Sequence, residues 1–204
     1  IALLGWNPGT EQEIFSLEEL KQCFSSERLN KSPAIFDITK LTWMNGCYIR
    51  NLSETDFHKL ALPYYKDLEN KNMDLTFLSK VLQPRIEVLN QITEQTDFLA
   101  EMPKYDVALY ENKKMKTNPE IAAKALNLVL PVLENINDWT NETLFNTLKE
   151  TAVANEMKNG QILYPVRIAL SGKETTPGGA TELAHILGKN ETLSRIKNAI
   201  TKLA

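Results

Sequence analysis

Hydrophobic residues recur at intervals of three and four positions along most of this chain, and the alternation typical of a β-strand is nearly absent. The clearest stripe follows Asn118 and Pro119, which have the order of a helix cap and a proline at the first helical position. Its members are Ala122, Ala125, Leu126, Val129, Leu133 and Ile136. A second stripe consists of Leu193, Ile196, Ile200 and Leu203. Ser16 and Glu19 have the spacing of a capping box. The pattern predicts an all-α protein made of many helices, with no extended sheet.

Two polar stretches interrupt the helical pattern. They are YYKDLENKNM, after Pro63, and YENKKMKTNPE, which leads into the stripe that follows Pro119. Clusters of polar and charged residues between periodic segments are typical of connecting loops. We therefore predict helical subdomains at residues 1–65, 66–115 and 116–204. No internal repeat or low-complexity tract is present in the sequence.

One predicted helix, DLTFLSKVLQPRIEVLNQI, has an arginine in its hydrophobic face. Its hydrophobic positions are Leu75, Leu78, Leu82, Leu89 and Ile92, and Arg85 completes the series. Pro84 removes a backbone donor and predicts a kink. Two interpretations stay open. Arg85 either lays its stem along the core and pairs with water or with a carboxylate such as Glu87, or it displays its planar set of donors in a groove, where it recognises a base edge or a phosphate.

The segment YPVRIALSG contains a second arginine of this kind. If Pro165 occupies the first helical position, Arg167 lies in the first turn, where the helix dipole disfavours a cation. An anionic or polar ligand would offset that penalty, and a solvated surface arginine is the alternative. We expect Gly172 to end this helix in the left-handed conformation.

The following stretch, SGKETTPGGATELAHILG, contains a Gly-Lys pair but is not a phosphate-binding P-loop. The first glycine of that motif and its magnesium-binding hydroxyl are both missing from the required positions. We predict instead that Thr176 caps the next helix, with Pro177 in its first turn. Gly178 and Gly179 would then leave the backbone amides of that helix open to a flat group. The alternative is an ordinary, well-capped turn between two helices.

Composition narrows the possible functions. The chain has 204 residues, of which 43% are hydrophobic, so it can form a globular core. Its net charge of −3 provides no overall basic surface, so any contact with nucleic acid must be local. The spacing of Cys23, Cys47, His58 and His185 favours reduced thiols and indicates no zinc site.

The sequence also bears on where the protein works. No hydrophobic run approaches the roughly 20 residues of a membrane span, and no signal peptide is recognisable. We expect a soluble, cytoplasmic monomer that uses neither a membrane nor DNA as a partner. The chain opens with IALLGW and has no initiator methionine, so we also expect it to be a piece of something longer.

Five blocks support a family resemblance. They are ALLGWNPGTEQEIFSLEEL, RLNKSPAIFDITKLTWMNGCYIR, QPRIEVL, KNGQILYPVRIALSGKETTPGGATELAHILGK and ETLSRIKNAI. In this order they resemble the C-terminal half of bacterial glutamyl-tRNA synthetase, a class I aminoacyl-tRNA synthetase. The resemblance implies a stem-contacting helical segment at 1–65, followed by two anticodon-binding helical subdomains at 66–115 and 116–204.

The same resemblance implies a function. The parent enzyme would attach glutamate to its tRNA with ATP and Mg²⁺, and its catalytic domain, with the HIGH and KMSKS motifs, would be missing from this chain. The chain alone would then need no cofactor or metal and have no catalytic residue. Its partner would be tRNA for glutamate, with tRNA for glutamine as a possible second partner.

The resemblance further implies roles for five residues. Arg85 matches the family arginine that recognises the third anticodon base, which separates glutamate tRNA from glutamine tRNA, and this match suggests an enzyme that rejects glutamine tRNA. Arg167 matches an arginine that contacts the first anticodon base. Thr176 and Pro177 match residues of the same base pocket, and Gly179 stands where some relatives have a leucine.

Two hypotheses of other classes remain. A free-standing helical adaptor that binds a protein would suit the negative charge and the lack of a basic tract. An independent enzyme has little support, because no histidine or cysteine has a nucleophile or base partner at a recognisable spacing. Lys31, Arg50 and the lysines of ENKKMK are candidates for contacts with RNA phosphates, and solvated surface charge is the alternative for each.

Overall fold

The computed structural model describes residues 2–30, 35–69 and 71–204, and the regular elements in these ranges are helices. The α-helices are α1 (Ala2–Gly5), α2 (Leu17–Cys23), α3 (Ile38–Asn51), α4 (Glu54–Ala61), α5 (Leu75–Leu82), α6 (Gln91–Ala100), α7 (Pro119–Glu134), α8 (Asn141–Ala154), α9 (Asn159–Ser171) and α10 (Ala180–Leu203). Short 3-10 helices are η1 (Ser26–Arg28), η2 (Leu62–Tyr64), η3 (Lys66–Leu68), η4 (Gln83–Arg85) and η5 (Val107–Tyr110). Two isolated β-bridges join Trp6 to Leu29 and Asn112 to Thr117. The prediction of an all-α fold without a sheet is confirmed.

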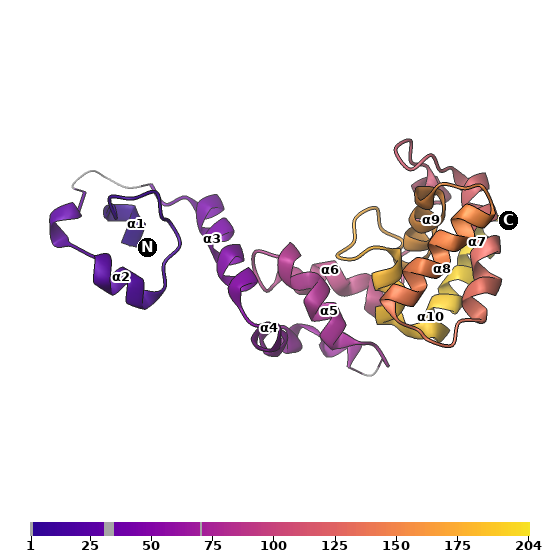
Figure 1. The fold of residues 1–204 in the computed structure, drawn as a ribbon, viewed down its shortest axis with the longest axis horizontal. Helices are drawn as coiled ribbons and strands as arrows, with labels where there is room; N and C mark the ends of the chain where they lie inside the picture. The colour runs from indigo at the N-terminus through magenta and orange to yellow at the C-terminus, as the bar shows by residue number, and fades with distance from the viewer. Residues whose placement is uncertain (1, 31–34, 70) are drawn as a thin grey trace.

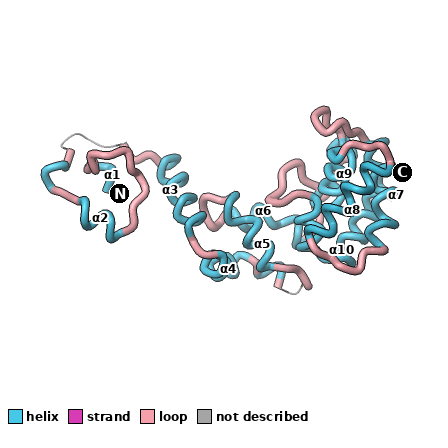
Figure 2. Tube along the Cα trace, in the orientation of Figure 1, coloured by secondary structure: helices cyan, strands magenta, loops and turns pink. Residues whose placement is uncertain are grey.

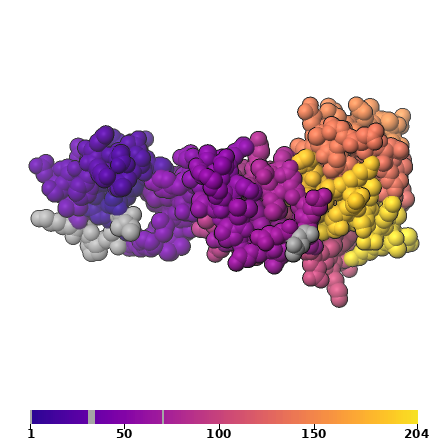
Figure 3. All heavy atoms as spheres, turned by 90° about the horizontal axis from the view of Figure 1, so that it is seen from below, coloured from indigo at the N-terminus to yellow at the C-terminus, as the bar shows by residue number. Residues whose placement is uncertain are grey.

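The molecule is elongated, and its helices are arranged in a row (Figure 1). α1 and α2 lie at one end, α3 leads to the group formed by α4, α5 and α6, and α7 to α10 form a bundle at the other end, so the two termini lie far apart (Figures 1 and 2). A perpendicular view shows the same row of bodies (Figure 3).

Local capping explains where several helices begin. The Ser16 hydroxyl accepts a hydrogen bond from the Glu19 amide at 3.2 Å, and the Glu19 carboxylate accepts one from the Ser16 amide at 2.7 Å, so the predicted capping box is confirmed. These hydrogen bonds lower the pKa of Glu19. Asn118 caps α7 with a single hydrogen bond, which its side-chain oxygen accepts from the Ile121 amide at 2.8 Å, and Pro119 is the first residue of the helix.

The buried core is continuous from α3 to α10. It contains the predicted stripe of α7, together with buried residues of α4, α5, α6, α8 and α9. In the second half of α10, Ile196 is buried, and Leu193, Ile200 and Leu203 pack against the core. The subdomain boundaries near residues 66 and 115 stay a prediction.

The segment around Pro84 differs from the prediction of one kinked helix running to Ile92. α5 ends at Leu82, η4 covers the next three residues, and Ile86 is extended, with φ −114° and ψ 152°. Because Pro84 cannot donate a backbone hydrogen bond, the α-helix gives way to a 3-10 turn, and α6 begins only at Gln91. The side chain of Gln83 ties this turn to the end of α3, where its amide nitrogen donates to the carbonyl oxygens of Ile49 and Leu52.

The start of α9 also differs from prediction. The helix begins at Asn159, where the Gln161 side chain accepts a hydrogen bond from the Lys158 amide at 2.9 Å. Pro165 therefore lies inside the helix, and Arg167 is in its second half rather than its first turn. The predicted dipole penalty on Arg167 is consequently wrong. The prediction for Gly172 is confirmed, since it ends α9 with φ 60° and ψ 18°.

Candidate nucleic-acid interface

A groove of about 440 Å³ lies between α6 and the loop that follows α9. Its lining residues are Arg85, Gln91, Glu94, Gln95, Lys173, Thr175, Thr176 and Pro177. Three of the five residues singled out in the sequence, Arg85, Thr176 and Pro177, therefore meet in one groove, although Arg85 lies about 90 positions before the other two in the chain.

Arg85 lies at this groove with its guanidinium partly held by the protein. Nη1 donates to the carbonyl oxygen of Val81 at 2.5 Å, and Nη2 lies 3.8 Å from the Glu182 carboxylate. The ion-pair partner is thus Glu182 and not Glu87, the neighbour expected from the sequence. The Arg85 side chain is 43% exposed, so its guanidinium remains accessible to a ligand in the groove.

Arg167 lies under the same loop and holds it in place. Its Nη1 donates to the Glu174 carbonyl oxygen at 2.8 Å and to the Thr176 hydroxyl at 3.2 Å, and its guanidinium carbon lies 5.2 Å from the centre of the Tyr164 ring. Burial lowers the pKa of Arg167, against smaller opposing effects of Tyr164 and Glu174. A half-buried, oriented arginine is suited to recognise an acceptor-rich group such as a base edge or a phosphate.

Lys173 fixes the loop to the opposite wall. Its ammonium group donates to the Asp97 carboxylate and to the Glu94 carbonyl oxygen, and lies 5.8 Å from the centre of the Phe98 ring. Arg167 on one side and Lys173 on the other therefore hold the loop between them. A groove with both walls fixed loses little conformational entropy when a ligand binds.

The start of α10 departs from the prediction that Thr176 caps it and that its amides lie open. The N-cap residue is Gly179, and the Glu182 carboxylate accepts a hydrogen bond from the Gly179 amide at 2.6 Å. The Thr176 hydroxyl instead donates to the Gly178 carbonyl oxygen at 2.7 Å. The prediction was wrong because Gly179 and Glu182 themselves have capping-box spacing, and that carboxylate occupies the helix end.

A second groove of about 680 Å³ lies on the other side of this loop. It is lined by Met115, Asn141, Phe145, Gly160, Leu163, Tyr164, Arg167, Gly179, Ala180, Thr181 and Glu182. Arg167 and Gly179 belong to this groove and not to the one with Arg85. Sequence reasoning missed the contribution of Phe145 and Glu182, although the spacing of Glu182 from Gly179 was a visible signal.

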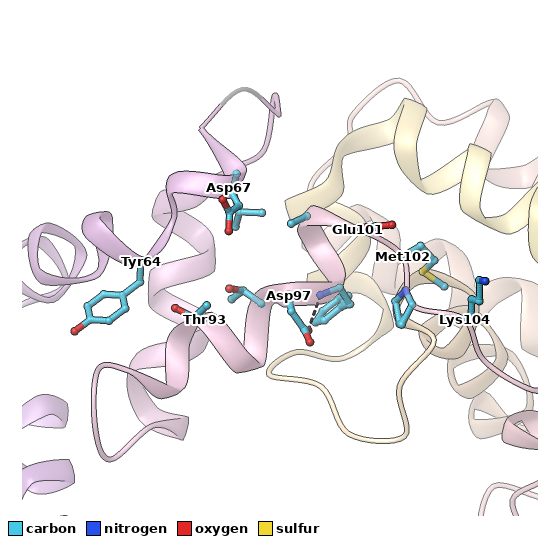
Figure 4. A pocket seen from close by; sticks show the side chains of 12 residues that line it. Tyr64, Asp67, Thr93, Asp97, Glu101, Met102 and Lys104 are labelled. Carbon is cyan, nitrogen blue, oxygen red and sulfur yellow. Dashed lines mark hydrogen bonds between the residues drawn. The ribbon is translucent and has the colours of Figure 1, made fainter.

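The opposite side of α6 has a different electrostatic character. A depression of about 420 Å³ there is lined in part by Asp67, Asp97 and Glu101, with Lys104 at its edge (Figure 4). Carboxylates repel phosphates, so this side of α6 is a poor surface for a nucleic-acid backbone. The groove that contains Arg85 and Lys173 is the better candidate.

Comparison with known proteins identifies the family. A family model described as the anticodon binding domain matches residues 56–200. The chain belongs to this anticodon-binding family. It is 55% identical over 203 residues to a glutamate–tRNA ligase of Clostridium tetani and 50% identical over 204 residues to that of Clostridium acetobutylicum. Each match covers 100% of the chain, and the chain spans 42% of the length of these relatives.

Solved structures agree with this assignment of the anticodon-binding fold. The crystal structure of a glutamate tRNA ligase from Elizabethkingia meningosepticum, in complex with its amino acid, superposes with a TM-score of 0.84 at 25% identity. The match covers 100% of this chain and 40% of that one. The resemblance to glutamyl-tRNA synthetase is confirmed, and the adaptor hypothesis gains no support from these comparisons.

Two further observations concern other kinds of site in this anticodon-binding chain. Within residues 2–30, 35–69 and 71–204, no helix is long and apolar enough to cross a bilayer, and no group of three or more metal-ligating side chains comes together.

Of the candidate phosphate contacts, Lys31 lies outside the described residues. Arg50 is exposed at the end of α3, where its guanidinium contacts the Cys47 sulfur at 3.3 Å.

Proposed function

We propose that this chain is the tRNA-binding, anticodon-recognising region of a glutamate–tRNA ligase. The observation that most directly supports the proposal is the groove in which Arg85, Thr176 and Pro177 meet, within a chain that matches the anticodon-binding family over residues 56–200. The partner is tRNA for glutamate. The parent enzyme attaches glutamate to it with ATP and Mg²⁺, which act outside this chain.

The geometry of the two grooves suggests a division of roles. Arg85, in the groove against α6, recognises the third anticodon base. Arg167, with Gly179, faces the second groove and contacts the first base. Thr176 and Pro177 line the groove of Arg85, and Thr176 is joined to Arg167 by a hydrogen bond. Direct base contacts of this type contribute about 1–3 kcal/mol of discrimination each.

The charge distribution supports selective rather than sequence-blind binding. With a net charge of −3, the chain depends on a few placed cations, and the carboxylates of Asp67 and Glu101 disfavour the far side of α6. Since Arg85 corresponds to the residue that separates two tRNAs, the parent enzyme discriminates against tRNA for glutamine. The protein acts as a monomer in the cytoplasm.

A fluorescence-anisotropy titration tests the proposal. The chain is titrated with labelled glutamate tRNA, glutamine tRNA and an unrelated tRNA at two salt concentrations. We expect glutamate tRNA to bind most tightly at both. If glutamate and glutamine tRNA bind equally and the unrelated tRNA binds more weakly, the synthetase assignment stands and the proposed discrimination against glutamine tRNA is wrong. Equal binding of all three tRNAs would contradict anticodon recognition.

A further inference from the structure

Glu182 lies at the boundary between the two grooves and contacts the residues of both. Its Oε2 accepts the hydrogen bond from the Gly179 amide at 2.6 Å, and the same oxygen lies 3.8 Å from Nη2 of Arg85. The side chain is 28% exposed and forms part of the second groove, beside Arg167. One carboxylate oxygen therefore faces a helix end on one side and the guanidinium of Arg85 on the other.

The surroundings leave this carboxylate little freedom. A Cβ atom on Gly178 would lie 3.1 Å from the Glu182 Cβ and 3.3 Å from Cγ1 of Val81, so the loop backbone packs directly on these two side chains. Val81 also provides the carbonyl oxygen that accepts from Nη1 of Arg85. The two nitrogens at the tip of Arg85 thus face the two residues on which the loop backbone rests.

We propose that Glu182 is a positioning residue for Arg85, which fixes the guanidinium for recognition of the third anticodon base and couples it to the loop of Thr176 and Gly179. This inference rests on the proposed function. The Val81 carbonyl accepts from Nη1, and Nη2 faces Glu182 at the ion-pair distance of 3.8 Å, so both nitrogens at the tip are oriented by the protein and the remaining N–H groups are available to the groove. An unpositioned arginine would serve as a mobile cation that attracts any phosphate but discriminates poorly between bases.

Glu182→Gln separates the two roles of this side chain. Glutamine at the third position of a helix still completes a capping box, so the hydrogen bond to the Gly179 amide is kept, while the charge facing Arg85 is removed. Glu134→Gln is the matched control, because Glu134 makes a comparable exposed ion pair, with Lys197, away from both grooves. Melting temperatures of both variants report on the fold.

The readout is a discrimination ratio, the dissociation constant for glutamate tRNA with its third anticodon base changed divided by the dissociation constant for unchanged glutamate tRNA. We expect Glu182→Gln to lower this ratio by about two- to fivefold, the range of a partly exposed ion pair. Affinity for the altered tRNA should not fall, because a carboxylate near a polyanion has been removed. Glu134→Gln should leave the ratio unchanged.

A double-mutant cycle with Arg85→Ala shows whether Glu182 acts through Arg85. Arg85→Ala alone should remove most of the discrimination, and Glu182→Gln should then have no further effect on the ratio. If Glu182→Gln lowers the ratio equally in both backgrounds, or in neither, the positioning role is wrong. If Arg85→Ala itself leaves the ratio and the affinity for glutamate tRNA unchanged, the assignment of Arg85 in the proposed function fails, and the positioning role fails with it.

A second variant covers the case in which Glu182→Gln disturbs the fold. Glu182→Asp keeps the charge at the helix start but withdraws the carboxylate by one methylene from Arg85. We expect the ratio to fall with this variant as well, and its melting temperature reports any loss of the hydrogen bond to the Gly179 amide. Full retention of discrimination by Glu182→Asp would contradict the inference, because contact with Arg85 would then not matter.

Discussion

Nη1 of Arg167 donates a hydrogen bond to the Thr176 hydroxyl across 3.2 Å, which joins a residue of α9 and a residue of the following loop into one unit. The hydroxyl in turn donates to the Gly178 carbonyl oxygen at 2.7 Å. Arg167 therefore shapes the loop as well as offering N–H groups to a ligand. Under the proposed function, base recognition by Arg167 and the geometry of the loop are linked through this chain of hydrogen bonds.

The first prediction concerns this unit. Arg167→Ala should weaken binding of glutamate tRNA by about 1–3 kcal/mol, since it removes the base contact that we propose for this residue. Thr176→Val, which keeps the shape and removes the hydroxyl, should weaken binding by a smaller amount. Because the two side chains interact directly, the double variant should lose less than the sum of the single losses. Anisotropy titrations measure all three values, with the exposed Thr201→Val as a control; full additivity would argue against a unit.

A second prediction concerns the turn at Gly172. This residue has φ 60°, and a Cβ atom there would lie 2.8 Å from Cδ1 of Tyr105 and 3.1 Å from Cγ of Pro103. Gly172→Ala should therefore lower the free energy of unfolding by at least about 1–2 kcal/mol, the cost of a left-handed residue with a side chain. Urea denaturation measures this loss. Gly5→Ala is the control, because its Cβ would meet nothing within 4 Å. Equal stability of the two variants would contradict the close approach at Gly172.

A third prediction concerns Arg195, a 5% exposed arginine of α10. Its Nη1 donates to the carbonyl oxygens of Leu170 at 2.6 Å and Phe98 at 2.9 Å, which binds the ends of α9 and α6 together. Arg195→Met leaves these buried carbonyls without a donor and should cost about 1–3 kcal/mol of unfolding free energy. Lys197→Met, an exposed substitution on the same helix, should cost little. A stable Arg195→Met variant, shown by urea denaturation, would mean that other donors replace the guanidinium.

The contrast between capping residues and Arg195 shows what the sequence could predict. Ser16, Asn118 and Gly172 form their hydrogen bonds with residues only three or four positions away, so the local sequence was enough to predict these helix ends. Arg195 depends on carbonyl groups that are 25 and 97 positions away in the chain, and no local pattern indicates them. The family resemblance placed Arg85 and Thr176 at the site, but their meeting in one groove depends on how α6 packs beside the loop after α9.

The errors at Pro84 and Gly179 have local causes. At Pro84 the hydrophobic spacing continued across a residue that cannot donate, and the chain leaves the helix there with Ile86 buried in an extended conformation. At the start of α10, both Thr176 and Gly179 were possible N-cap residues. Gly179 is the one that caps the helix, because the Glu182 carboxylate at the third helical position binds its amide. In both cases hydrogen bonding decided the element boundary where periodicity was ambiguous.

A fourth prediction concerns pH. Tyr65 is buried, and although its hydrogen bond with the Ser79 hydroxyl at 2.9 Å opposes the effect, desolvation raises the pKa of Tyr65 to about 12. The folded chain thus holds this proton more tightly than the unfolded chain, whose tyrosine pKa is about 10. The stabilisation is fully present below pH of about 10 and is lost as the pH rises through about 12, at up to about 1.4 kcal/mol per pH unit.

Urea denaturation at a series of alkaline pH values measures this effect. Tyr65→Phe should reduce the slope of unfolding free energy against pH in that window, and part of the slope should remain because burial also raises the pKa of Tyr110. An unchanged slope in Tyr65→Phe would show that Tyr65 ionises at the same pH in both states.

The central claim is that this chain recognises the anticodon, and an anticodon transplant tests it most directly. The three anticodon bases of an unrelated tRNA are replaced with those of glutamate tRNA, and binding of the chain is measured by fluorescence anisotropy before and after the exchange, at constant salt. We predict that the transplant tightens binding by at least about fivefold, the lower end of what one good base contact contributes. Unchanged affinity after the transplant would contradict anticodon recognition.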